Sequence, residues 1–318
     1  MSFLSSKRPV FVFFVLIMGF LSGCEKDNEV EPTGPIILGD TRYRDFVFVE
    51  TIATPDVVYG QNTSQGGRQI DLRMNIYEPA NDSLDTRPLV ILAHGGGFTD
   101  GAREDFDRWA REFAHAGYVA ATISYRIMDA AEPNLKIAVI QAVHDMKAAV
   151  RFFTKDEQYK VNPNQVFVGG FSAGAVMALH AAYIDQKDLP LLPPEITEYM
   201  AENDGISGNS GNPGASDAIK GVINVSGGLF KANFVQAGEP ILYSAHGTKD
   251  KEVYCTIDPQ AANNPGGDFT EGACLIHPIA EAAGIVNRFN SIEGGDHGAF
   301  FACEDCEEKV RLFLYENL

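Results

Sequence analysis

Residues 166–182 read VFVGGFSAGAVMALHAA, and the pattern of the sequence changes within them from strand to helix. The first part is a short apolar run, as a strand buried on both faces requires. The last part is rich in alanine, the strongest helix former. Between them lies Gly170-Phe171-Ser172-Ala173-Gly174, a G-x-S-x-G element in the strand–turn–helix context that gives this pattern its meaning. A tight turn there would hold Ser172 in strained backbone with its hydroxyl exposed, so Ser172 is a candidate nucleophile.

Apolar strands and helices alternate on both sides of this element. Strands are expected at residues 42–51, 69–77, 88–93, 118–124, 165–169, 219–226, 241–246 and 286–292, and helices at 109–116, 132–155 and 173–184. Strands that alternate with helices form a mostly parallel sheet covered by helices on both faces. The chain is therefore predicted to have an α/β fold with one catalytic domain over residues 41–318.

Two polar, glycine-rich stretches interrupt the alternation. They cover residues 186–217, with a short helix expected at 195–202, and residues 255–276. Loops of this length within a compact domain usually serve a function. Both are predicted to be insertions at the C-terminal edge of the sheet, where open α/β folds bind ligands.

A glycine-rich turn follows the expected strand at 88–93. It reads His94-Gly95-Gly96-Gly97-Phe98, and consecutive glycines allow backbone N–H groups to converge on one oxygen atom. We assign a candidate oxyanion hole to the amides of Gly96, Gly97 and Ala173. His94 is interpreted as structural, fixing the turn through its ring nitrogens.

A serine nucleophile needs a base and an orienting acid, and the chain order serine, acid, histidine is typical of this strand–turn–helix fold. His297 lies between glycines directly after the last expected strand, and Asp250 lies in the loop that follows the strand at 241–246. A carboxylate in such a loop can reach Nδ1 of the histidine and hold its tautomer. His277 is the other downstream candidate, but its place before Pro278 favours a surface or helix-end position.

Five motifs, in this order, resemble the α/β-hydrolase superfamily: HGGGF at 94–98, Tyr125-Arg126, GFSAG at 170–174, HGTKD at 246–250 and GGDHG at 294–298. The likeness extends over about residues 69–318 and is closest to the carboxylesterase and lipase branch with the His-Gly-Gly-Gly motif, which includes feruloyl- and acetyl-esterase-like bacterial lipoproteins. The resemblance implies hydrolysis of small-molecule or glycan esters by Ser172, His297 and Asp250, without a cofactor or a metal. Phe171 and the insertion at 255–276 depart from many relatives. The insertion and the stretch 186–217 leave the substrate, rather than the chemistry, undetermined.

Other functions agree less well with these residues. A prolyl-oligopeptidase-like peptidase would use the same three residues, but such enzymes usually carry a further large domain. A non-catalytic glycan-binding lipoprotein would not need an intact serine, acid and histidine. A zinc enzyme is disfavoured because Cys303-x-x-Cys306 lacks a second close pair of ligands. The formal charge of −18 makes nucleic acid an improbable partner.

The N-terminus reads as an export signal. Lys7 and Arg8 precede an apolar run that ends in Leu21-Ser22-Gly23-Cys24, which resembles the bacterial lipobox. We predict a lipoprotein signal peptide at residues 1–23, lipidation of Cys24 and an acidic, proline-containing tether at 24–40. The expected location is the bacterial cell envelope, with the lipid anchored in a membrane, for which the outer membrane is favoured. The sequence leaves open whether the protein faces the periplasm or the cell surface.

The other four cysteines favour two disulfides, because exported proteins form them in oxidising compartments. Cys255 and Cys274 flank the same excursion from the sheet, so we predict that they pair and that Cys303 pairs with Cys306 by elimination. The strongest rival pairing is Cys255 with Cys303, which would join the Asp250 loop to the His297 loop.

Overall fold

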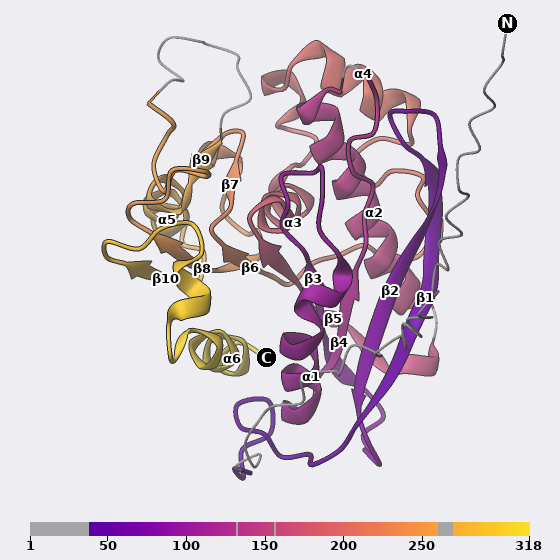
Figure 1. Cartoon of the computed structure of the whole chain (residues 1–318), viewed down its shortest axis with the longest axis vertical. Helices are drawn as coiled ribbons and strands as arrows, with labels where there is room; N and C mark the ends of the chain where they lie inside the picture. Colours follow the sequence, from indigo (N-terminus) through magenta and orange to yellow (C-terminus); the bar gives the residue numbers. More distant parts are fainter. Residues whose placement is uncertain (1–37, 132, 156, 260–269) are drawn as a thin grey trace, which may run out of the picture. The chain divides into compact units, whose positions relative to one another are not determined.

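An eight-stranded sheet organises the part of the chain that the computed structural model describes, which is residues 38–131, 133–155, 157–259 and 270–318 (Figure 1). The strand order is β1-β2-β4-β3-β5-β6-β8-β10. β1 is antiparallel to β2 and β2 to β4, whereas every pairing from β4 to β10 is parallel. The predicted mostly parallel sheet is confirmed. The bounds are β1 Thr51–Thr63, β2 Gln69–Pro79, β3 Arg87–Ala93, β4 Val119–Ile123, β5 Val161–Phe171, β6 Gly221–Val225, β8 Ile241–Gly247 and β10 Asn287–Ile292.

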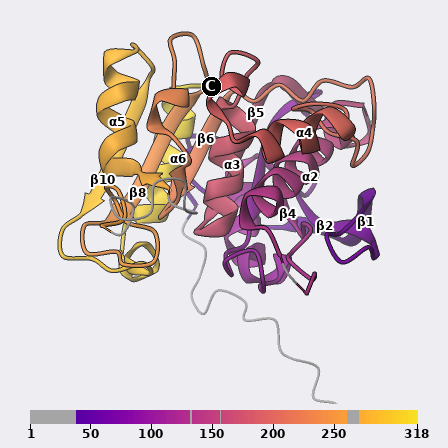
Figure 2. The same cartoon turned by 90° about the horizontal axis from the view of Figure 1, so that it is seen from above.

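Helices cover both faces of this sheet (Figures 1 and 2). Alternate residues of β3 point to opposite faces, as strand geometry requires: Leu89 and Ile91 pack with α2 and α3, whereas Val90 and Leu92 pack with α1 and α6. This explains why β3 is apolar along its whole length. The helix bounds are α1 Asp107–Ala116, α2 Leu135–Lys155, α3 Ala173–Tyr183, α4 Pro194–Glu202, α5 Ala273–Ala282 and α6 Cys306–Glu316.

Residues 42–50 do not form a strand, so the prediction of a strand at 42–51 is wrong. Residues 41–45 form a turn in which the amide of Asp45 donates to the carbonyl of Thr41 over 2.8 Å. The amides of Val47 and Phe48 donate to the carbonyl of His115 at the end of α1, so this segment seals a helix end rather than joining a sheet.

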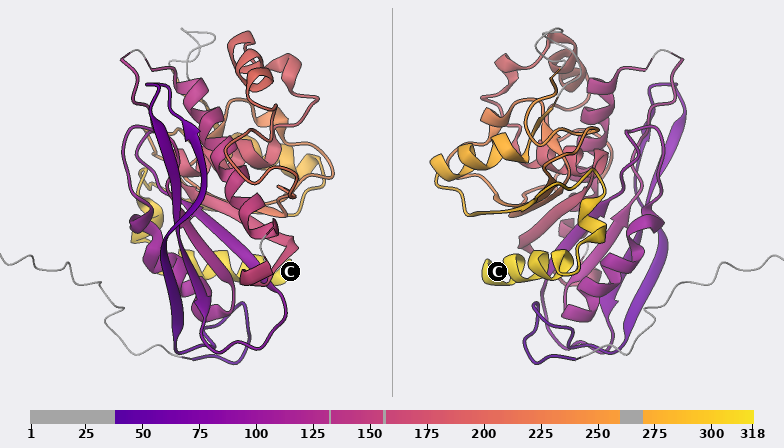
Figure 3. Two further views of the ribbon diagram at one scale, coloured as in Figure 1. Left: turned by 90° about the vertical axis from the view of Figure 1, so that its right-hand side faces the viewer. Right: turned by 60° about the vertical axis from the view of Figure 1, so that its left-hand side comes forward.

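The true edge strand is β1, which forms a long antiparallel pair with β2 at one side of the sheet (Figure 3). β1 was not predicted from the sequence for two reasons. Many of its positions are exposed to water, as is usual for an edge strand, and its register with β2 shifts between Thr54 and Val57. No hydrophobic alternation marks such a strand.

The stretch 186–217 follows α3 and packs along α2. Its helix α4 confirms the short helix predicted at 195–202. Arg151 of α2 donates to the carbonyls of Ser207 at 2.7 Å and Gly211 at 2.9 Å, which fixes the stretch to that helix. The predicted signal peptide, Cys24 and residues 24–37 of the tether lie outside the described residues.

Candidate active site

Ser172 sits at the turn between β5 and α3 with a φ of 53°. This left-handed conformation is strained for a residue with a side chain. It is supported from outside, because the Ser172 amide donates to the carbonyl of Val225 in β6 over 2.9 Å. A Cβ on Gly170 would lie 2.3 Å from the carbonyl oxygen of Ala93, and one on Gly174 would lie 2.2 Å from it. Both glycines are therefore required by the close approach of the turn to the end of β3.

The three residues predicted to form the oxyanion hole line one pocket together with Ser172. Gly96 and Gly97, with φ of 103° and 59°, line it from the loop after β3, and Ala173 lines it as the first residue of α3. The glycine loop is held in place because the Thr99 amide donates to the carbonyl of Gly96 over 3.0 Å. Donors from a glycine turn and a helix N-terminus can stabilise negative charge on a bound oxygen atom.

His94 is buried beneath this loop rather than in the pocket. Its Nδ1 lies 2.8 Å from the carbonyl of Gly95, and its ring stacks on Tyr125 at 4.3 Å. Burial lowers the pKa of His94, so the neutral ring is favoured. This agrees with the structural role expected for it.

The loops after β8 and β10 bring the acid and the histidine together. Nδ1 of His297 lies 2.7 Å from Oδ2 of Asp250. The two loops are bonded to each other, since the Lys249 amide donates to the carbonyl of Gly295 over 2.8 Å. Oγ of Ser226 donates to the carbonyl of His297 over 3.0 Å and holds the histidine from β6. His297 and Ser172 line the same pocket.

Asp250 has a second histidine partner, His246. His246 is the first residue of the HGTKD motif, but it was not predicted to be a site residue. Nε2 of His246, at the end of β8, lies 3.2 Å from the same Oδ2. The amides of Glu252 and Val253 donate to Oδ1 over 2.9 and 3.1 Å. Burial opposes ionisation, but the hydrogen bonds from His246, His297 and the backbone outweigh it and hold the pKa of Asp250 well below its usual range. Asp250 is therefore ionised at neutral pH, as an acid that orients an imidazole must be.

A mainly apolar pocket of about 360 Å³ opens onto these groups. The ring of Phe171 lies 4.7 Å from that of His297, so the residue between Gly170 and Ser172 forms part of the wall and braces the histidine. The other side chains that line the pocket include Phe98, Leu135, Val139, Val176, Phe230, Glu252, Val253 and Thr270.

Comparison with known proteins agrees with this arrangement. Residues 74–227, slightly less than half of the chain, match the model of the BD-FAE family, an α/β-hydrolase esterase family. The propionate-bound structure of esterase 2 from Thermogutta terrifontis superposes with a TM-score of 0.57 at 22% identity, over 82% of this chain and 92% of that one. The chain has the α/β-hydrolase fold. The segment that matches the esterase family contains the G-x-S-x-G turn, so the comparisons indicate an enzyme of the serine esterase type.

A second structure of similar fold is a truncated carbohydrate esterase from gut microbiota. The two superpose with a TM-score of 0.56 at 16% identity, over 83% of this chain and 95% of the other. At such low identities, the two superpositions show a shared fold and nothing more. No curated protein matches the sequence.

Glu252 lines the same pocket, although it was not predicted from the sequence. Its side chain is 75% exposed, and its Oε2 lies 3.8 Å from Nε2 of His297. Its place two residues after Asp250 could have suggested it, because the loop that positions the acid also forms one wall of the pocket. It places a negative charge near Nε2, the ring nitrogen of His297 that does not contact Asp250.

Two expectations about the surroundings of the site are wrong. His277 is not at the surface: it is buried within α5, its Nδ1 lies 2.9 Å from Oδ1 of Asn287, and its ring stacks on Phe289. The stretch 186–217, predicted to lie at the ligand-binding edge of the sheet, contributes no residue to this pocket among those described and packs along α2 instead. The insertion at 255–276, by contrast, places Thr270 in the pocket wall.

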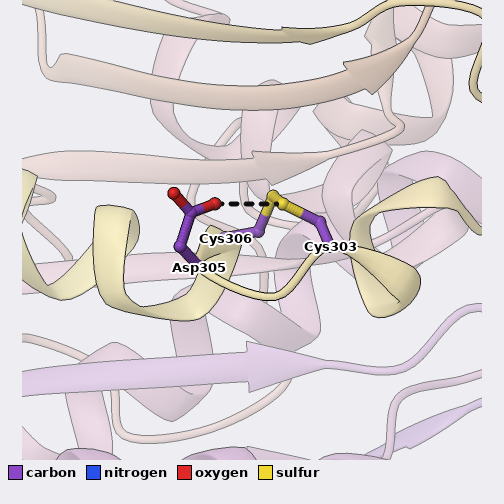
Figure 4. Close-up of side chains that lie close together, drawn as sticks. All are labelled: Cys303, Asp305 and Cys306. Atoms are coloured by element: carbon purple, nitrogen blue, oxygen red, sulfur yellow. Dashed lines mark hydrogen bonds between the residues drawn. A yellow bond between two sulfur atoms is a disulfide. The ribbon is translucent and has the colours of Figure 1, made fainter.

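The structure contains the disulfides Cys255–Cys274 and Cys303–Cys306, the pairing predicted from the sequence. Asp305 lies near the second of them, with Oδ1 3.4 Å from Sγ of Cys303 (Figure 4). Because the two sulfurs are bonded to each other, they are not available as thiolate ligands, and this cluster does not form a metal centre in the oxidised protein.

Proposed function

We propose that this protein is a carboxylic-ester hydrolase in which Ser172, His297 and Asp250 act as nucleophile, base and orienting acid. The observation that supports this most directly is the 2.7 Å contact of Asp250 with Nδ1 of His297, at a pocket that Ser172 also lines from a strained turn. With Nδ1 donating to the acid, Nε2 of His297 is left as the basic nitrogen.

The reaction then proceeds in two halves. Nε2 of His297 takes the proton of Ser172, whose Oγ attacks the ester carbonyl carbon, and the resulting oxyanion is bound by the amides of Gly96, Gly97 and Ala173. The carbon–oxygen bond to the alcohol breaks, His297 protonates the departing oxygen, and an acyl-enzyme remains. His297 next takes a proton from water, the hydroxide attacks the acyl carbon, and Ser172 leaves with its proton restored.

The substrates we propose are esters with short acyl groups, including acetyl or feruloyl decorations of glycans. The pocket is lined by several aromatic and aliphatic side chains but has a volume of only about 360 Å³. An acyl group that is small or flat suits such a space. The carbohydrate esterase of similar fold supports a glycan as the alcohol part.

The test compares wild type, Ser172→Ala and the control Ser291→Ala on p-nitrophenyl esters of increasing acyl length. Ser291 is an exposed residue of β10 that lies outside the pocket. We expect Ser172→Ala to lower kcat by several orders of magnitude with little change in the unfolding midpoint, because it removes the nucleophile and little volume. Wild-type activity should be highest at short chains. Turnover near wild type in Ser172→Ala would reject the nucleophile, and a maximum at ten or more carbons would reject the substrate class.

We further propose that the protein is a lipoprotein anchored through Cys24 in the bacterial cell envelope. The support is the sequence alone, in which Leu21-Ser22-Gly23-Cys24 follows the apolar run directly. Among the helices that the structure describes, none has the length and apolar character needed to cross a bilayer.

A further inference from the structure

A second cavity, of about 540 Å³, lies apart from the catalytic pocket. Three segments that are distant in the sequence form its walls. They are residues 62–65 at the turn between β1 and β2, Ala130 with Ile137 and Gln141 of α2, and residues of 199–209 at the end of α4 and in the loop after it. The third segment belongs to the stretch 186–217, which therefore builds this cavity instead of covering the catalytic pocket.

The chemistry of the walls is polar and uncharged. Of the lining residues that the structure describes, none carries a formal charge. Five supply side-chain amides, which both donate and accept hydrogen bonds, as sugar hydroxyls do. The five are Asn62, Gln65, Gln141, Asn203 and Asn209.

The walls offer no counter-charge to a charged ligand, and polar atoms make up more of their surface than apolar atoms do. The larger apolar groups are Ile137 and the half-buried ring of Tyr199. An aromatic ring of this kind can pack against the apolar face of a sugar ring while amides bind the hydroxyls around it. The composition of the cavity therefore favours a neutral carbohydrate.

Gln141 points to a ligand independently of this composition. Only 3% of the residue is exposed, and its Oε1 has no hydrogen-bond partner within the described part of the chain. A buried polar atom without a partner costs roughly 1–3 kcal/mol. A change of the side-chain rotamer would turn this oxygen towards the cavity, where a bound hydroxyl group would supply the missing donor.

The walls are also held in place before any ligand arrives. Nδ2 of Asn62 donates to Oδ1 of Asn209 over 2.7 Å, which joins the first segment to the third. Gln65 makes two bonds with the backbone of Asn134, of 2.8 and 2.9 Å, which join the first segment to the start of α2. A preorganised site avoids part of the entropic cost of binding.

The cavity and the catalytic pocket share α2 as a common wall. Leu135 and Val139 line the catalytic pocket, whereas Ile137 and Gln141 line the polar cavity. A shift of two residues turns a helix by roughly 200°, so the two openings lie on opposite sides of its first turns. One helix diameter, about 10 Å, separates them.

We propose that the polar cavity is a non-catalytic binding site for a neutral oligosaccharide. It would hold a glycan beside the catalytic pocket, so that an ester group elsewhere on the same chain can reach Ser172. Binding in the cavity does not depend on the proposed esterase chemistry, whereas the benefit to catalysis does.

The experiment measures binding of ester-free oligosaccharides to the full chain by calorimetry. The probes are xylohexaose, cellohexaose and mannohexaose as neutral glycans, and hexagalacturonate as an anionic one. The variants are Gln141→Leu and Asn209→Ala, with Asn164→Ala as an exposed amide outside the cavity. Hydrolysis of p-nitrophenyl acetate is recorded for each variant.

We expect at least one neutral hexaose to bind, hexagalacturonate to bind at least ten-fold more weakly, and both cavity variants to weaken the neutral glycan at least ten-fold. Asn164→Ala should bind as wild type does. Hydrolysis of p-nitrophenyl acetate should not change in any of the three. If no neutral glycan binds, or if Asn209→Ala binds like wild type, the proposal is overturned. Failure of Ser172→Ala to lose activity would overturn only the proposed esterase mechanism, because these probes contain no ester.

Discussion

At the scale of single residues, the site depends on two groups held in costly states. Ser172 adopts a φ of 53°, and Asp250 is a buried carboxylate. Each is over-determined by its surroundings: Ser172 by the bond to β6 and the glycines beside it, and Asp250 by two histidines and two amides. Backbone strain and buried charge persist where neighbouring groups compensate for them.

Glu252 leads to a prediction about substrate charge. Its carboxylate lies 3.8 Å from Nε2 of His297, at the pocket. The two substrates are mono-p-nitrophenyl succinate, which is anionic, and p-nitrophenyl butyrate, which is neutral. We expect Glu252→Gln to raise the ratio of kcat/KM for the succinate to that for the butyrate about five-fold, because a repulsion of about 1 kcal/mol between the Glu252 carboxylate and the substrate carboxylate is removed. Steady-state kinetics on the two substrates measure the ratio.

The control for this change is Glu304→Gln, which removes an exposed carboxylate that does not line the pocket. It should leave the ratio as in wild type, and added salt should reduce the effect of Glu252→Gln. An equal effect of both substitutions would mean that the net charge of the protein, rather than Glu252, governs the discrimination.

At the scale of elements, α3 does more than present Ser172. His180 on this helix is fully buried, with Nδ1 2.7 Å from the carbonyl of Val176 and Nε2 accepting from the amide of Phe230 over 3.0 Å. Phe230 forms part of the catalytic pocket. Only the neutral imidazole satisfies both contacts, so the helix fixes one wall of the pocket through a histidine that must stay uncharged.

This predicts an acid-sensitive contribution to stability. Burial lowers the pKa of His180 from 6.5 to about 4, although its bond to Val176 acts in the opposite direction. Below pH 6.5 the unfolded chain binds a proton that the folded one does not, so the free energy of unfolding falls as the pH drops towards 4, by up to about 1.4 kcal/mol per unit. In His180→Gln this part of the slope should vanish. Urea unfolding between pH 4.5 and 7.5 measures it, and parallel curves for variant and wild type would contradict the assignment.

The disulfides give a second prediction at this scale. Cys255 and Cys274 are separated by 19 residues and close the loop that follows Glu252 and Val253. Replacing both by alanine should lower the free energy of unfolding by about 3 kcal/mol, because the unfolded chain regains the freedom of that loop. Activity should fall as well, since the pocket wall loosens.

The matched control is removal of Cys303–Cys306, whose separation is 3 residues. The smaller loop should cost less stability. Chemical denaturation of the two double variants compares them directly. If the short bridge proved the more important, the chain-entropy explanation would be wrong.

At the scale of the whole molecule, the prediction concerns where the enzyme resides. Cys24→Ser should move the protein from the membrane fraction to the soluble fraction, because lipid chains on Cys24 would be its anchor. Fractionation of cells, followed by detection of the protein in each fraction, is the measurement. Retention of the variant on the membrane would rule out the anchor.

Local patterns in the chain were sufficient for much of this protein. The turn at Ser172, the glycine loop after β3, the central apolar strands and both disulfide pairings could be predicted, because each depends on neighbouring residues or on the order of elements. The edge strand β1 could not, since its exposed positions leave no periodic signal.

Only the tertiary structure decided the contacts between segments that are distant in the sequence. His246 as second partner of Asp250, Glu252 beside His297, and the polar cavity built from three segments all depend on the paths of loops. Hydrophobic periodicity specifies which face of an element is buried. It does not specify where a polar loop without such periodicity will run. For this reason the residues proposed for the chemistry could be predicted from the sequence alone, whereas the polar cavity emerged only from the packing of α2 against the stretch 186–217.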